Sequence, residues 1–222
     1  MNNTLQAYQP PPNEGLRIIF EDQDLLVLDK PSGLLSVPGR GAEKADCLIR
    51  RVQQHFPDAL IVHRLDMETS GLIVMARSAA VHRQLSMLFE QRAVSKRYVA
   101  VVDGQLLPES GEVDLPLNVD WPNRPLHMVD HQNGKPSQTR YLRLDYDAVQ
   151  DVSRVELDPL TGRTHQLRVH MLSLGHPIIG DGLYADPAAR AKASRLLLHA
   201  EWLAFPHPLS GEPCEFHAEA DF

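Results

Sequence analysis

The sequence lacks the features that mark several common classes of protein. Its 222 residues include only two cysteines, Cys47 and Cys214, which lie far apart and form no CxxC pair. This spacing argues against a cysteine zinc site, is neutral about a disulfide, and makes a reducing cytoplasm the simplest compartment. No apolar run has the length that a membrane-spanning helix requires, so no membrane partner is expected.

Cofactor motifs are absent as well. The sequence contains neither GxGxxG nor GxxxxGK[ST], so nothing supports a nucleotide cofactor. His165 and His170 are five positions apart, whereas two imidazoles on one helical face are four apart, so no metal site is expected. Residues 1–15 have neither the basic start nor the apolar stretch of a secretion signal, and they are predicted to form a flexible tail.

The charge is acidic overall but unevenly distributed. A net charge of −7 disfavours a nucleic-acid partner, because cationic side chains supply most of the affinity for phosphates. The stretch from Arg77 to Ala100 nevertheless holds five basic residues against Glu90 alone, whereas Glu201 to Phe222 holds five acids and neither Lys nor Arg. The basic stretch is either a nucleic-acid contact or an ordinary solvated face.

The pattern of apolar residues predicts an α+β domain. Short β-branched runs predict strands, and an Asn133-Gly134 turn predicts a hairpin that joins residues 126–129 to residues 139–142. Three helices are expected, capped by Asp46, Ser78 and Thr164. Strands joined by short turns, with few helices between them, favour a largely antiparallel sheet.

The length is sufficient for one large domain, which we expect to cover residues 16–222. The strand pattern loosens between residues 103 and 125, which include the rigid stretch Trp121–Pro125. We therefore expect two subdomains that share one sheet, with the chain crossing between them near residues 103–125.

The loop His63–Gly71 lies between two predicted buried strands, at residues 59–62 and 72–76. A lone aspartate in a loop is most often a turn former, but Asp66 has charged neighbours in a loop held at both ends. Its carboxylate can act as a nucleophile or a base if it stays ionised, and a nearby arginine would lower its pKa. Arg168, in the polar segment 161–170, is the candidate partner, with a solvated helix face as the alternative.

Two further hypotheses concern the neighbouring residues. Asp66 and Glu68 could form the carboxylate pair of a glycoside hydrolase, but residues two apart on an extended loop point in opposite directions. Tyr98 opens a predicted strand after two basic residues and could stack on an RNA base. It could equally be an ordinary tyrosine of the core.

Five segments in order resemble the RluA family of pseudouridine synthases, over the chain from about Phe20 to Pro208. They are Lys30–Gly33, His63–Gly71, Lys96–Ala100, Thr161–His170 and Gly175–Asp181. The resemblance implies the pseudouridine synthase fold, in which a largely antiparallel mixed sheet with flanking helices surrounds a central active-site cleft. It also implies isomerisation of uridine to pseudouridine in structured RNA, by base flipping and without a cofactor.

The resemblance assigns roles to five residues. Asp66 matches the catalytic aspartate, which attacks the sugar or initiates glycal formation, and Arg168 matches the basic residue that pairs with it. Tyr98 matches the aromatic residue that packs on the target base, and Leu167 the apolar residue that walls the pocket. Arg64 is similar to the arginine that enters the RNA stack in place of the flipped nucleotide.

The likeness also suggests substrates. Leu34–Arg40, Asp120–Pro125 and Gly134–Pro136 are similar to family members of dual specificity, which implies a uridine in a tRNA anticodon stem-loop and one in a 23S rRNA stem-loop. Further RNA contacts are expected from Arg92, Lys96, Arg97 and Arg163. The chain is too short for the S4 domain of several relatives, and we expect a cytoplasmic monomer. An RNA-binding module without chemistry, and a carbohydrate enzyme, stay as alternatives.

Overall fold

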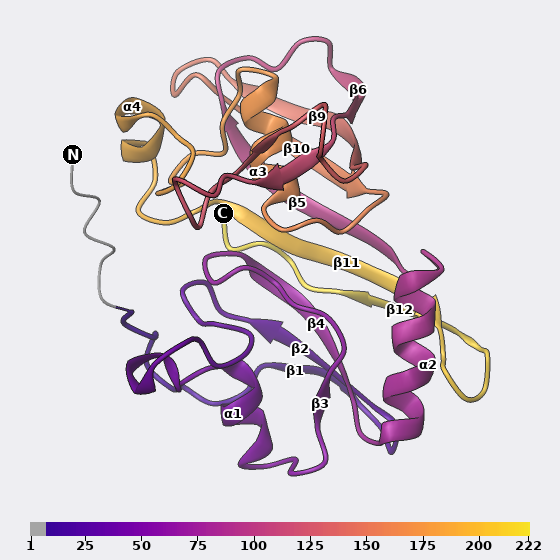
Figure 1. The fold of residues 1–222 in the computed structure, drawn as a ribbon. Helices are drawn as coiled ribbons and strands as arrows, with labels where there is room; N and C mark the ends of the chain where they lie inside the picture. Colours follow the sequence, from indigo (N-terminus) through magenta and orange to yellow (C-terminus); the bar gives the residue numbers. More distant parts are fainter. Residues whose placement is uncertain (1–7) are drawn as a thin grey trace.

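The computed structural model describes residues 8–222, in which a large sheet crosses the molecule and few helices flank it (Figure 1). The helices are α1 (Leu48–Gln53), α2 (Ala79–Glu90), α3 (Gln166–Ser173) and α4 (Pro187–Ala191), with a short 3-10 helix at Ala42–Lys44. The strands are β1 (Ile18–Glu21), β2 (Leu25–Lys30), β3 (Leu60–Ile61), β4 (Ser70–Ala76), β5 (Ser95–Asp103), β6 (Ser110–Asp114), β7 (Leu117–Val119), β8 (His127–Val129), β9 (Gln138–Asp147), β10 (Val152–Pro159), β11 (Leu198–Pro206) and β12 (Pro213–His217).

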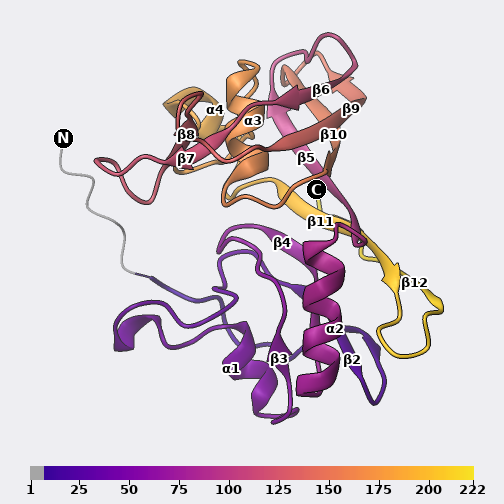
Figure 2. The ribbon, with the colours of Figure 1, turned by 45° about the vertical axis from the view of Figure 1, so that its right-hand side comes forward.

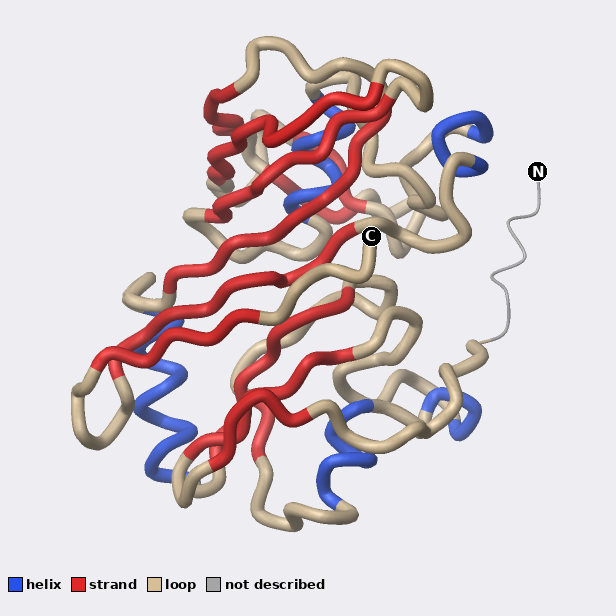
Figure 3. The backbone as a smooth tube through the Cα atoms, turned by 180° about the vertical axis from the view of Figure 1, so that it is seen from behind, coloured by secondary structure: helices blue, strands red, loops and turns tan. Residues whose placement is uncertain are grey.

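The main sheet has ten strands in the order β1-β2-β4-β11-β5-β10-β9-β6, with β3 also paired to β4 and β12 to β11. Its strand pairs within residues 8–222 are antiparallel except β4 and β11, which meet in parallel at Ser70–His199 and Gly71–Ala200. Seen from behind, the strands lie in front of α2 and α3 (Figure 3), so these helices cover the opposite face. The predicted α+β class with a mixed, largely antiparallel sheet is confirmed.

The sheet joins two halves, each with its own core. In the first half, β2 and β4 are buried along their whole length, as expected of central strands covered on both faces. The core of the second half gathers apolar residues of β5, β10, α3 and the start of β11. Tyr98 packs against the cores of both halves, so it lies at their junction.

The chain passes from the first half to the second along β5 and returns along β11. The segment 103–125, where the sequence suggested the crossing, lies within the second half, because Leu106 and Val113 belong to its core. The small sheet of β7 and β8 lies beside α3 and α4 in this half (Figure 2).

The three predicted helices form, but only one predicted cap does. The hydroxyl of Ser78 accepts a hydrogen bond from the Val81 amide at 3.2 Å, as expected. Asp46 does not cap α1, because its carboxylate instead binds the Arg51 guanidinium at 2.7 Å. Thr164 does not cap α3, since the residue before the helix is His165, in the left-handed conformation with φ 56°.

The predicted hairpin at Asn133-Gly134 is wrong. Residues 127–129 pair with β7, and β9 pairs with β6 and β10. The Gly134 amide donates to the Asp130 carbonyl, and Lys135 bonds to Leu117, which turns the chain toward β7. Each of the two segments therefore pairs with a strand other than the one that the local turn signal predicted.

The expected flexible tail covers residues 1–15, of which residues 1–7 lie outside the described residues. Tyr8 donates its hydroxyl proton to the Asp46 carbonyl at 3.0 Å, and the Arg51 guanidinium donates to the Pro11 and Pro12 carbonyls. Residues 8–12 therefore lie against α1. None of the helices in residues 8–222 is long and apolar enough to span a bilayer.

Candidate active site

A cleft of about 490 Å³ contains most of the residues that the sequence singled out. The first half contributes the start of the loop between β3 and β4, and the second half contributes β5 and the segment leading into α3. The predicted site residues that line it are Arg64, Asp66, Lys96, Tyr98, Arg163, Leu167 and Arg168. Arg92 and Arg97 do not line it.

A buried lysine supports the loop that carries Asp66. Lys30 is fully buried at the end of β2, and its ammonium donates to the carbonyls of Pro31, Leu34 and Met67 at 2.9, 2.8 and 3.0 Å. Burial lowers the pKa of Lys30 to about 7, although the negative charge of Asp66 opposes this shift. The three carbonyls replace the water that the lysine loses.

Two serines fix the same loop from the other side. Ser32 donates its hydroxyl to the Glu68 carbonyl, and Ser36 donates to the Leu65 carbonyl, each at 2.7 Å. These contacts hold the loop through its backbone and leave the Asp66 side chain 28% exposed to the cleft. The Lys30–Gly33 segment is therefore a support for the loop that carries Asp66.

Arg168 lies beside Asp66, as the sequence suggested. Its Nη1 is 3.9 Å from Asp66 Oδ2, and only 2% of its side chain is exposed. Asp181 accepts hydrogen bonds from its Nε at 2.7 Å and from its Nη2 at 2.5 Å, and the Tyr184 ring lies 5.2 Å from the guanidinium. Burial alone would lower the pKa of Arg168, but the hydrogen bonds and charge of Asp181, with Asp66 and Glu68, raise it above its ordinary value.

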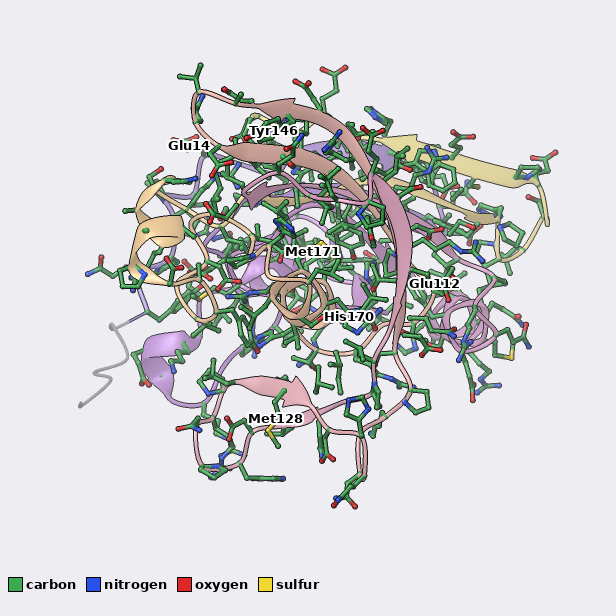
Figure 4. All side chains as sticks on the ribbon, turned by 90° about the horizontal axis from the view of Figure 1, so that it is seen from above. Glu14, Glu112, Met128, Tyr146, His170 and Met171 are labelled. Carbon is green, nitrogen blue, oxygen red and sulfur yellow. The ribbon has the colours of Figure 1, made fainter. Side chains whose placement is uncertain are left out.

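The helix that carries Arg168 is itself anchored. On α3, His170 and Met171 lie toward the middle of the view from above (Figure 4), and both are fully buried. His170 Nδ1 lies 2.9 Å from the Thr139 hydroxyl, and its Nε2 lies 3.2 Å from the Leu115 carbonyl. The position of Arg168 therefore depends on contacts of α3 with β9 and the segment before β7.

Glu68 also reaches Arg168, so the expectation that it points away from Asp66 is wrong. The Thr69 amide donates to the Asp66 carbonyl at 3.2 Å, which makes the segment a turn instead of an extended loop. Glu68 Oε2 lies 3.3 Å from Arg168 Nη2. Burial raises the pKa of Glu68, and Arg168 partly offsets this effect.

Three residues near Asp66 were missed as site residues: His165, Asp181 and Tyr184. His165 Nε2 lies 3.9 Å from Asp66 Oδ2, and its Nδ1 lies 2.6 Å from the Tyr184 hydroxyl. Asp181 is fully buried and also accepts from the Leu183 and Tyr184 amides, at 2.8 and 3.1 Å. The one sequence signal for Asp181 is that it ends Gly175–Asp181, one of the five segments that resemble the family.

Tyr98 and Leu167 form walls of the cleft. Burial, assisted by the negative charge of Asp66, raises the pKa of Tyr98, so its hydroxyl stays protonated near neutral pH. Leu167 is 7% exposed and packs in the core of the second half. The cleft therefore has an aromatic wall at Tyr98 and an aliphatic wall at Leu167, beside the charged groups of Asp66 and Arg168.

The predicted RNA-binding residues divide into two groups. Along β5, side chains alternate between faces, so Lys96 lines the cleft with Tyr98 whereas Arg97 lies on the opposite face. There Arg97 Nη1 is 3.7 Å from Glu156, and its guanidinium is 4.2 Å from the Trp202 ring. Arg64 and Arg163 are exposed and line the cleft, whereas Arg92 is exposed just beyond α2.

One set of side chains in residues 8–222 is close enough to share a metal ion, and it lies outside the cleft. Asp22, Asp24 and His207 form this set. The Leu209 and Ser210 amides donate to His207 Nδ1, so the neutral ring carries its proton on Nε2, which lies 3.3 Å from Asp22. A protonated Nε2 has no free electron pair for a metal, and the contact with Asp22 already explains the cluster.

Residues 24–173 match the family model described as RNA pseudouridylate synthase. The chain belongs to this family. The dual-specificity RNA pseudouridine synthase RluA of Escherichia coli strain K12 is 52% identical over 98% of this chain and 99% of its own length. That of Vibrio parahaemolyticus is 47% identical, over 96% of this chain and 89% of its own length.

Solved structures support the same family. Human RNA pseudouridylate synthase domain containing 1 has a TM-score of 0.80 at 30% identity, covering 96% of this chain and 87% of that one. Human RNA pseudouridylate synthase domain containing 4 has a TM-score of 0.74 at 26% identity, covering 91% of this chain and 88% of that one. As a pseudouridine synthase, the protein is an isomerase that converts uridine to pseudouridine in RNA.

Proposed function

We propose that this pseudouridine synthase modifies two RNAs, at a uridine in a tRNA anticodon stem-loop and at a uridine in a 23S rRNA stem-loop. The observation that carries the proposal is the 52% identity, along nearly the whole of both chains, to an enzyme named for dual specificity. Three further segments resemble dual-specificity members: Leu34–Arg40, Asp120–Pro125 and Gly134–Pro136. A loop uridine is already partly unstacked, so extracting it costs less than extracting a base from a stem.

In the proposed mechanism, Asp66 acts on the ribose of the flipped uridine, either by attacking the sugar or by starting glycal formation. Arg168 supplies a positive charge beside the Asp66 carboxylate, at 3.9 Å in a buried setting. Tyr98 packs on the uracil and Leu167 closes the pocket. Because the detached uracil has little room to leave, it rotates and rejoins the sugar through C5.

Recognition of the RNA is assigned to cationic residues at the cleft. Arg64 fills the position that the flipped nucleotide leaves, and Lys96 and Arg163 contact the RNA around it. All three residues are close to the proposed reaction site, since they line the same cleft as Asp66. We further propose that residues 16–222 act as one catalytic domain in a cytoplasmic monomer, since a single chain supplies Asp66, Tyr98 and Arg168.

Tritium release from uracil C5 tests the proposal, because the hydrogen at C5 is lost when the new carbon bond forms. The wild-type protein should release tritium from both stem-loops, and Asp66→Asn from neither. Asp58→Asn is a matched control, because Asp58 is an exposed carboxylate that pairs with Arg77 away from the cleft. Release from one stem-loop alone contradicts dual specificity, and full release by Asp66→Asn contradicts the role of Asp66.

A further inference from the structure

A chain of hydrogen-bonding groups ends at Asp66 and is formed by residues outside the proposed mechanism. The His127 amide donates to the Tyr184 hydroxyl oxygen at 2.8 Å, and that oxygen lies 2.6 Å from His165 Nδ1. The other ring nitrogen of His165, Nε2, lies 3.9 Å from Asp66 Oδ2. Tyr184 comes from the loop between α3 and α4, so elements of the second half alone build the chain that reaches Asp66.

The hydrogen bonds determine which nitrogen of His165 carries the proton. Within residues 8–222, the Tyr184 oxygen has two partners, of which the His127 amide can only donate. Of these two partners, only His165 Nδ1 can accept the hydroxyl proton of Tyr184, and we assign the proton to that bond. Burial lowers the pKa of His165 to about 4, so its ring is neutral at pH 7 and carries its proton on Nε2. That N–H lies on the side of Asp66.

The backbone directs the ring toward Asp66. His165 has a φ of 56°, a left-handed conformation that non-glycine residues seldom adopt, immediately before the first turn of α3. Its ring also contacts the rings of His127 and Tyr184 edge-on, with centroids 5.0 and 5.5 Å apart. Such strain persists where surrounding contacts impose it, and it is frequent at functional sites.

His165 and Arg168 approach the same oxygen of Asp66. Nε2 of His165 and Nη1 of Arg168 are each 3.9 Å from Oδ2, too far for a hydrogen bond but close enough for an electrostatic contact. The His165 ring and the Arg168 guanidinium therefore both act electrostatically on the Asp66 carboxylate.

We propose that His165, kept in its Nε2-protonated form by Tyr184, is a positioning residue that orients the Asp66 carboxylate toward the ribose. This inference rests on the proposed role of Asp66. His165 does not exchange a proton with the RNA; it acts through Asp66 alone. Its contribution thus appears in the rate of the reaction and not in the affinity for RNA.

Tyr184→Phe is the sharpest test, because it removes the hydroxyl but retains the ring beside Arg168. The single-turnover rate should fall on the order of tenfold, while Kd for the stem-loop stays at the wild-type value. Nitrogen NMR of histidine-labelled protein should show His165 protonated on Nε2 in the wild type and a mixture of tautomers in the variant. Tyr146→Phe is the control, since it loses a hydroxyl bonded to Asp151 at 2.9 Å on the exposed edge of β9.

A second pair of variants separates the N–H group from the ring. His165→Gln places an amide donor near the position of Nε2, so it should retain much more of the single-turnover rate than His165→Leu, at equal thermal stability. Equal rates in these two variants, or a wild-type His165 protonated on Nδ1, would overturn the proposal. If the wild type isomerises neither stem-loop, the proposed substrates fail, whereas the tautomer seen by NMR still reports on the Tyr184–His165 bond.

Discussion

The first half of the molecule positions Asp66 through the backbone of its loop, whereas the second half positions Arg168 through its side chain. Lys30, Ser32 and Ser36 donate to carbonyls around Asp66, whose own carboxylate is 28% exposed. Arg168 is instead held directly by the Asp181 carboxylate and is 2% exposed.

Arg168 is therefore a fixed charge, whereas the Asp66 carboxylate can change its orientation. A guanidinium held in a dry site supplies an electrostatic field that needs no reorganisation during the reaction. In the proposed mechanism, the Asp66 carboxylate acts on the ribose. Rotation about its side-chain torsions helps it to reach the sugar, provided that its backbone is fixed. The first half therefore fixes the backbone around Asp66, and the second half fixes the side chain of Arg168, at the same cleft.

The largest expected effect comes from removing the partner of the buried arginine. Asp181→Asn should reduce the free energy of unfolding by about 3–5 kcal/mol, because it removes the buried carboxylate that accepts two hydrogen bonds from the Arg168 guanidinium. Glu68→Gln is the matched comparison, since Glu68 contacts the same guanidinium at 3.3 Å but is 32% exposed. Its expected loss is below about 1 kcal/mol. Equal losses of unfolding free energy in the two variants, measured with denaturant, would contradict the conclusion that the Asp181 carboxylate holds Arg168 in place.

An intermediate effect concerns pH, because each half contains a histidine whose pKa burial lowers far below its ordinary value. Burial lowers the pKa of His63 to about 3 and that of His165 to about 4, from an ordinary 6.5. At a pH between the folded and the ordinary pKa of each histidine, the unfolded chain binds more protons than the folded chain. Stability therefore falls as the pH drops below 6.5. Each histidine should account for a loss on the order of 1–2 kcal/mol between pH 7 and pH 5.

His63→Gln isolates the contribution of the first half. His63 Nε2 accepts a hydrogen bond from the Val74 amide at 3.1 Å, and a glutamine oxygen can take its place without titrating. Unfolding measured at both pH values should lose less stability in this variant than in the wild type. An unchanged pH dependence would show that His63 does not stay neutral in the folded protein.

The smallest effect separates two arginines that the sequence grouped together. Arg163 lines the cleft, whereas Arg97 lies on the other face of β5 beside Trp202. Arg163→Gln should reduce the slope of log K against log salt by about 0.7–0.9, the loss of one phosphate contact. Arg97→Gln should leave the slope unchanged in the same RNA-binding titration. The reverse result would place the RNA on the opposite face of the sheet.

Local features of the sequence predicted much of the fold. The buried run of β4, the Ser78 cap and the loop around Asp66 all follow from residues within a few positions of one another. The predicted hairpin at Asn133-Gly134 failed because residues 127–129 pair with β7 and not with residues 139–142. The predicted cap at Thr164 failed because the helix begins one residue later, after His165 in a left-handed conformation.

By itself, the sequence determined the candidate carboxylate and its family, because five contiguous segments occur in the order typical of that family and one of them contains Asp66. Only the tertiary structure decided what surrounds that carboxylate. The parallel pairing of β4 with β11 brings the loop of Asp66 to the segment before α3, and it requires Gly71, where a Cβ would lie 2.3 Å from the Ala200 carbonyl oxygen. The contacts of His165, Asp181 and Tyr184 arise from this long-range packing, which no local pattern of residues encodes.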